Sequence, residues 1–185
     1  CKNDFDSLLV PFRCVASDVF NKRKLVLDNG DLGDAVRASL SFPFVFKPIR
    51  IDSILAYDGG IYDNYPYDVM IEDFNPDFII GSIVSGEEDV PADYNMYGQI
   101  KSMIIQSSSY DIPDSVGIDI EFDMRDIGLL DFNRIDEAYL SGYEQALPLI
   151  DSIKSRIPYT RSLESVKENR RRFKERMPEI IFKDI

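Results

Sequence analysis

The stretch that decides the fold is Tyr57-Asp58-Gly59-Gly60-Ile61-Tyr62-Asp63-Asn64-Tyr65-Pro66. Short apolar segments before it, at 49–51 and 54–57, predict extended strands that lead into a sharp glycine turn. The sequence contains no histidine among its 185 residues. Any base that this chain supplies to a nucleophile must therefore be another group, and the carboxylate of Asp58 is the natural candidate.

The two glycines after Asp58 suit a catalytic turn, because they let the backbone approach a reacting group and tolerate positive φ. Partial burial beside Tyr57 and Ile61 is expected to raise the pKa of the Asp58 carboxyl toward the working pH of a general base. On its own, however, the triplet is more typical of a surface turn. The flanking sequence therefore has to decide between these interpretations.

Strand-like and helix-like segments alternate along the chain, which predicts the α/β class with a largely parallel sheet. Beyond the segments already named, strands are expected as a hairpin of 13–17 with 24–27, as a buried parallel strand at 78–84, and at 116–124 with Asp119, Glu121 and Asp123 on a solvated face. Helices are expected at 35–40 with Asp34 as the cap, at 67–74, at 92–109, from 133 with a kink at Pro148, and at 160–177.

Three segments carry a resemblance to the patatin-like phospholipase family. They are Ala38-Ser39-Leu40-Ser41-Phe42-Pro43-Phe44-Val45-Phe46-Lys47-Pro48, the Asp58-Gly59-Gly60 turn with Asp63-Asn64-Tyr65-Pro66 behind it, and Ile79-Ile80-Gly81-Ser82-Ile83-Val84. The resemblance implies the three-layer patatin-like fold, of which this chain is the C-terminal portion followed by a helical tail.

The family uses a Ser-Asp dyad, so the resemblance implies a lipid acyl hydrolase of the phospholipase or lysophospholipase type, with Asp58 as the catalytic acid/base residue. The G-x-S-x-G nucleophile elbow of that family has no counterpart in this chain. We therefore expect the serine on a missing upstream segment, and this chain to be inactive alone. Its expected partner is the N-terminal half of the domain or a second copy. The alternative is a non-catalytic patatin-fold interaction module that has lost the nucleophile.

Further residues near Asp58 are candidates for supporting roles. Gly59 and Gly60 form the turn, and Asn64 either braces it through side-chain hydrogen bonds or serves only as turn chemistry. Phe42, Phe44 and Phe46 are candidates for lining an acyl-chain pocket, although aromatic residues at this density more often belong to a core.

The composition of the chain argues against some classes of ligand and partner. The formal net charge of -12 argues against nucleic acid, whose phosphates need a basic face. The acidic residues between 111 and 126 fit no EF-hand loop, and the two cysteines lack zinc-ligand spacing, so neither a metal nor a cofactor is expected. The resemblance to the patatin-like family implies a lipid ester as the substrate.

The charge changes sign near residue 154. Residues 1–153 hold 11 basic and 28 acidic side chains, whereas 154–185 hold 10 basic and 5 acidic ones. This asymmetry predicts a domain at 1–156 and a basic helical tail or linker at 157–185 that leads toward a further domain. Arg170-Arg171-Arg172 is a candidate contact with a membrane surface, or part of a solvated linker helix. The tail is similar to the junction before a POTRA-type domain in bacterial patatin-like proteins, which favours the bacterial envelope, periplasmic or outer-membrane associated, over the cytoplasm.

Overall fold

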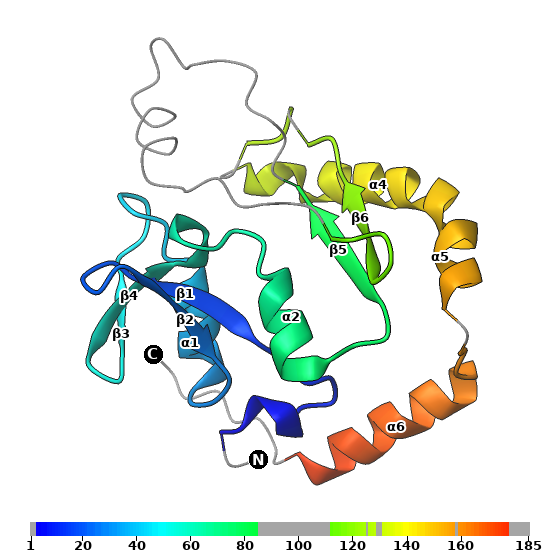
Figure 1. Ribbon diagram of the computed structural model, residues 1–185, viewed down its shortest axis with the longest axis horizontal. Coiled ribbons are helices and arrows are strands. Elements are labelled where there is room, and N and C mark those ends of the chain that lie inside the picture. Colours follow the sequence, from blue (N-terminus) through cyan, green and yellow to red (C-terminus); the bar gives the residue numbers. More distant parts are fainter. Residues whose placement is uncertain (1–2, 85–111, 125, 129–130, 158, 178–185) are drawn as a thin grey trace.

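The computed structural model describes residues 3–84, 112–124, 126–128, 131–157 and 159–177 (Figure 1). The strands are β1 (Cys14–Asp18), β2 (Arg23–Leu27), β3 (Ile49–Ile51), β4 (Ile54–Asp58), β5 (Ile79–Ile83) and β6 (Gly117–Glu121). The helices are α1 (Leu32–Ser39), α2 (Tyr67–Phe74), α4 (Ile135–Ala146), α5 (Ile150–Arg156) and α6 (Leu163–Arg176), with short 3-10 turns η1 (Phe5–Ser7), η2 (Gly59–Ile61), η3 (Phe132–Arg134) and η4 (Leu147–Leu149). This mixture confirms the α/β class. The helix expected at 92–109 lies outside the described residues.

The strands form two sheets, which lie on either side of α2 in Figure 1. One sheet has the order β2-β1-β4-β3 and is antiparallel throughout, whereas β5 and β6 pair in parallel. The expectation of a largely parallel sheet is therefore wrong for the described strands. The hairpins β1–β2 and β3–β4 have short connections, which can join only antiparallel neighbours, while the long connection from β5 to β6 permits parallel pairing.

The four-stranded sheet is packed through small residues. Ala16 in β1, Ala38 in α1 and Ala56 in β4 are completely buried against one another. Because alanine side chains are short, α1 can lie close to the sheet, and partly buried aliphatic residues of β2 and β3 surround this contact. Strand β1 is buried along its whole length, because it has a strand on each side and α1 against it.

The cap of α1 differs from the expectation. The side chain of Asp31 accepts a hydrogen bond of 2.9 Å from the backbone N–H of Asp34, so Asp31 is the N-cap and Asp34 is the third helical residue. A side chain at the N-cap position satisfies one of the free N–H groups of the first turn. Helix α1 therefore begins earlier than the apolar pattern suggested.

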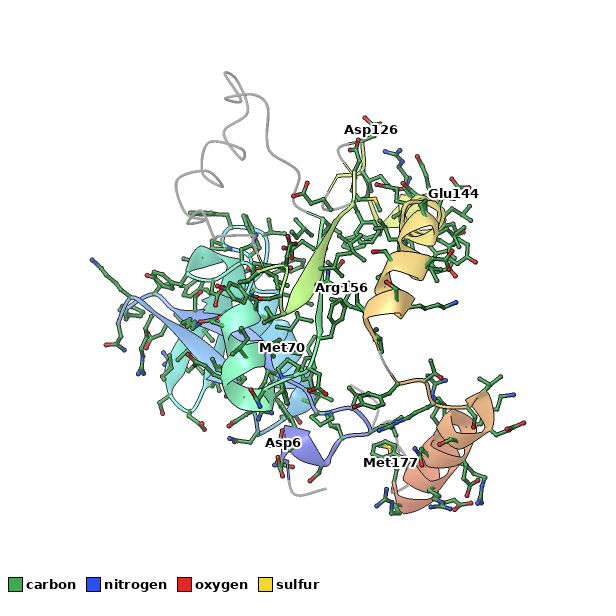
Figure 2. All side chains as sticks on the ribbon, turned by 45° about the vertical axis from the view of Figure 1, so that its right-hand side comes forward. Asp6, Met70, Asp126, Glu144, Arg156 and Met177 are labelled. Atoms are coloured by element: carbon green, nitrogen blue, oxygen red, sulfur yellow. The ribbon has the colours of Figure 1, made fainter. Side chains whose placement is uncertain are left out.

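The C-terminal helices follow the expected pattern more closely. Pro148 lies in η4, which separates α4 from α5, so the kink predicted at this proline is confirmed. Helix α6 is capped by Ser162, whose side chain accepts from the N–H of Ser165. Figure 2 shows Met177, at the end of α6, on the same side of the molecule as Asp6 of η1. Within the described ranges, no helix has both the length and the apolar character to cross a membrane.

Candidate functional site

Asp58 lies at the end of β4, where the strand passes into η2. Its backbone N–H donates a hydrogen bond of 3.0 Å to the carbonyl oxygen of Ser41, and in the sheet it stands opposite Ala16 of β1. Its side-chain Oδ1 accepts a hydrogen bond of 2.8 Å from the N–H of Gly60. The carboxylate is therefore oriented by the same turn that follows it.

The surroundings of Asp58 change its acidity. The side chain is half-buried, and this burial raises the pKa of the Asp58 carboxyl, although the hydrogen bond from Gly60 opposes the shift. The rise expected from the sequence is thus confirmed in direction. A carboxylate with a raised pKa is a stronger base toward a hydroxyl group than an ordinary surface aspartate.

The close approach between β1 and the turn η2 requires a glycine at position 59. Gly59 is buried, and a Cβ atom added to it would lie 2.4 Å from the carbonyl oxygen of Val15 in β1. Neither Gly59 nor Gly60 has a positive φ, so the expectation that these glycines supply left-handed backbone is wrong. The turn needs glycine because no side chain fits between β1 and the residue after Asp58.

Gly60 and Asn64 lie against each other. A Cβ atom on Gly60 would lie 2.7 Å from Oδ1 of Asn64 and 3.1 Å from Oδ1 of Asp58. The structure therefore brings Asn64 to the Asp58 turn, beside the residue that donates to Asp58. That Asn64 braces the turn stays a prediction.

The three phenylalanines of the expected acyl pocket lie in different environments. Phe42 is 7% exposed, Phe46 is 48% exposed, and Phe44 is 81% exposed with φ of 67°. The structure therefore places Phe42 in the core and leaves Phe44 open to solvent. A cavity of about 580 Å³ is found elsewhere, between residues 7–9 and α6. The acyl pocket stays a prediction.

The sequence did not reveal an ion-pair cluster beside the turn. Nζ of Lys24 in β2 lies 2.9 Å from Oδ2 of Asp63 and also contacts Asp68 in α2. Burial lowers the pKa of Lys24, but the two carboxylates outweigh this effect and raise it overall. Oδ1 of Asp63 accepts from the N–H of Tyr65 at 3.2 Å. The charges are visible in the sequence, but no local spacing pairs them.

A second contact missed by the sequence joins the turn region to β6. The hydroxyl of Tyr65 donates a short hydrogen bond to Oδ1 of Asp119, and Oδ2 of Asp119 accepts from the N–H of Ile112 at 2.8 Å. Asp119 was expected on a solvated face, and this expectation is wrong because Tyr65 lies against that carboxylate and leaves it half-buried. Burial and the bond to Asp119 raise the pKa of Tyr65.

Among the residues that the structure describes, no group of three or more histidine, cysteine, aspartate or glutamate side chains is arranged to hold a metal ion.

Comparison with known proteins supplies the context for this geometry. Residues 3–71 match the model of the family described as "Patatin-like phospholipase". An "uncharacterized NTE family protein" of Mycobacterium tuberculosis is 34% identical over 87 residues, which are 47% of this chain and 24% of that relative. Another protein of the same description, from Mycobacterium bovis, is 32% identical over 68 residues, or 37% of this chain and 12% of the relative.

The chain thus matches about a quarter or less of the length of these relatives. The family match nevertheless contains the whole antiparallel sheet, α1 and the Asp58 turn. Residues 3–71 of this chain are therefore similar to the patatin-like phospholipase family over the antiparallel sheet and the Asp58 turn.

Proposed function

We propose that the complete protein is a lipid acyl hydrolase with a Ser-Asp dyad, of the phospholipase or lysophospholipase type, and that this chain supplies its acid/base residue, Asp58. The observation that carries the proposal is the half-buried carboxylate of Asp58, with its raised pKa, at the end of β4 within the family match. The similarity of residues 3–71 to the patatin-like phospholipase family supports lipid hydrolysis as the class of reaction.

The proposed reaction uses Asp58 as a proton carrier. Asp58 accepts the proton of the serine hydroxyl while the serine oxygen attacks the ester carbonyl, and it returns that proton to the leaving alcohol. Asp58 then takes a proton from water, whose oxygen attacks the acyl-serine ester, and it returns that proton to the serine oxygen as the fatty acid leaves. We propose that the nucleophilic serine and the hydrogen-bond donors that stabilise the oxyanion lie in other parts of the complete protein.

The test is Asp58→Asn in the complete protein expressed from its natural open reading frame. This substitution keeps the size of the side chain and an acceptor for Gly60 but removes the base. We expect the rate of ester hydrolysis to fall at least about 100-fold, the lower end of what a positioned general base contributes.

Asp52→Asn is the matched control for that experiment. Asp52 is an exposed residue in the turn between β3 and β4, so the control removes one negative charge from the same hairpin without touching the Asp58 turn. Hydrolysis by the Asp58→Asn variant at the control rate would contradict the proposed function.

A second candidate function is a non-catalytic interaction module, and the exposed apolar face of α4 favours it. This face begins at Phe132 in η3 and continues along α4, and each of its side chains is more than half exposed: Phe132, Ile135, Tyr139, Leu140 and Tyr143. Tyr139 and Tyr143 stack with their ring centroids 6.3 Å apart. Such a face is typical of a partner-binding surface. A complete protein that binds a partner through this face but hydrolyses no lipid ester would favour this candidate over the first.

A further inference from the structure

We propose that Tyr65 and Asp119 are positioning residues for Asp58, because their hydrogen bond fixes the segment behind the Asp58 turn to β6 of the second sheet. This inference rests on the proposed function, since it assigns a task to residues that serve the same carboxylate.

Asp119, the acceptor of this hydrogen bond, is held in place by a second hydrogen bond. Asp119 lies in the middle of β6, and its second carboxylate oxygen accepts a hydrogen bond of 2.8 Å from the N–H of Ile112, which is 3% exposed. Both oxygens of Asp119 therefore have donors, and the carboxylate is fixed to one orientation. A fixed acceptor can determine where the tyrosine hydroxyl lies.

The neighbouring strand leaves space for the pair. Gly81 lies in β5 opposite Asp119 of β6, and a Cβ atom added to it would lie only 1.5 Å from the Tyr65 hydroxyl oxygen and 2.5 Å from Oδ1 of Asp119. The tyrosine hydroxyl thus occupies the space that a side chain at 81 would need. Both strands of the parallel pair contribute to this site.

The contact is connected to Asp58 through a short series of neighbours. Asn64 precedes Tyr65, and its side chain lies against Gly60, whose N–H donates to Oδ1 of Asp58. On the other side, Asp63 is held by Lys24 of β2 and accepts from the N–H of Tyr65. The segment behind Asp58 is therefore attached to both sheets, by Lys24 to the antiparallel one and by Asp119 to the parallel one.

Removal of the Tyr65 hydroxyl should loosen one of these two attachments. The segment could then move away from β6 and admit water to the Asp58 turn. Since burial is what raises the pKa of Asp58, greater hydration should lower it. The rate would then fall through misplacement of the base, and the acid limb of the pH–rate profile would move to lower pH.

The experiment compares Tyr65→Phe with Tyr67→Phe in the complete protein, with hydrolysis of a short-chain ester measured from pH 4 to pH 9. The Tyr67 hydroxyl has no hydrogen-bond partner among the described residues, so its loss is the matched control. We expect Tyr65→Phe to lower kcat/KM about tenfold or more and to shift the acid limb downward. Tyr67→Phe should change neither quantity.

A purely structural role would give a different result. A smaller folded fraction lowers the rate by one factor at all pH values, so an unshifted acid limb would overturn the inference. If Tyr65→Phe equals Tyr67→Phe while Asp58→Asn remains strongly impaired, the positioning role alone fails. If Asp58→Asn is fully active, the proposed function fails instead.

Amide hydrogen exchange in the 185-residue chain provides a readout that needs no activity. The amides of Gly60 and Ile112 should exchange faster in Tyr65→Phe than in Tyr67→Phe, because each belongs to the hydrogen-bonded series described above. Equal exchange at Gly60 in the two variants would contradict the coupling between Tyr65 and the Asp58 turn.

Discussion

The antiparallel sheet with α1 and the helices α4 to α6 differ in how they use their apolar residues. In the first region β1 is buried throughout, and α1 contributes the buried Ala35 and Ala38. In the second, no described residue of α4, α5 or α6 is fully buried, and Tyr139 on α4 is 69% exposed. The comparison shows that the Asp58 turn stands on a region that is packed by its own residues, whereas the apolar face of α4 is exposed.

The described residues of α4 and α6 form local ion pairs instead of a buried core. Arg171 and Arg172 both pair with Glu168 on α6 and lower the pKa of that glutamate to about 2, and Arg134 pairs with Glu137 at the start of α4. Figure 2 shows Glu144 of α4 directed away from the sheets. Exposed ion pairs of this kind stabilise a helix only weakly, because water and salt screen them. Substitutions should therefore have large effects in the sheet region and small ones in the helices.

The largest expected contrast is between two glycine substitutions. Gly59→Ala introduces a Cβ atom 2.4 Å from the backbone oxygen of Val15, so β1 and the turn must separate. We expect the free energy of unfolding to fall by about 2–3 kcal/mol, the upper part of the range of about 1–3 kcal/mol that is typical of overpacked cores. Among the described residues, the Cβ atom of Gly142→Ala in α4 meets only Cε of Met124, at 3.4 Å, and the substitution should raise the free energy of unfolding by about 0.5–1 kcal/mol through its higher helix propensity.

Urea-induced unfolding of the 185-residue chain, followed by circular dichroism, measures both effects. Because both variants add one methyl group, their difference reports the local environment rather than the chemical change. Similar effects of the two substitutions would contradict the contrast between a tightly packed sheet region and a loosely packed helical region.

Two carboxylates of the sheet region should respond to pH in opposite directions. Asp18 at the end of β1 is 1% exposed and accepts hydrogen bonds from the side chain and N–H of Asn21 and from Arg23, which lower its pKa. Its stabilisation is therefore present above the ordinary aspartate pKa of about 3.9 and is lost as the pH falls through the lowered folded value. Asp58 has a raised pKa, so its ionised form destabilises the fold above that pKa, and protonation relieves the penalty.

Thermal unfolding of the chain at pH 7 and at pH 4 tests these signs. Asp18→Asn should lower Tm at pH 7, and Asp58→Asn should raise it. The Asp58→Asn difference should shrink at pH 4, because the raised pKa lets the wild-type carboxyl take up protons there, whereas the Asp18→Asn difference should largely remain, because pH 4 still lies above the lowered pKa of Asp18. A decrease in Tm for Asp58→Asn at pH 7 would show that its hydrogen bond from Gly60 outweighs the cost of burying the charge.

Local patterns were sufficient to predict most of the elements. The hairpin of β1 and β2, the two short strands before Asp58, the helix at 67–74 and the break at Pro148 all follow from alternation, turn residues and proline chemistry. The Asp58 turn was visible for the same reason, since Asp-Gly-Gly is a local signal. Strand pairing was harder to predict, because alternating strands and helices favour a parallel sheet while short hairpins impose antiparallel neighbours.

Contacts between distant segments could not be predicted. The alternation at 117–121 separates two faces of β6, but it does not reveal that Tyr65 covers Asp119. Likewise, the sequence indicates a turn at Gly59, yet the close approach of Val15 depends on the pairing of β1 with β4. Both features arise from tertiary packing, and both lie beside the candidate catalytic residue.

The smallest expected effect concerns the exposed face of α4. Tyr139→Ser removes a side chain that is 69% exposed and stacks on Tyr143, so the free energy of unfolding of the 185-residue chain should change by no more than about 0.5 kcal/mol. In the complete protein the same substitution should cost clearly more, because a partner segment or a second copy would bury this face. Matched urea-unfolding curves of both proteins, with the exposed Glu144→Gln as control, separate the two cases. A loss above 1 kcal/mol in the 185-residue chain would show that Tyr139 already packs against other residues of this chain. The contrast between a packed sheet region and an exposed face of α4 would then be wrong.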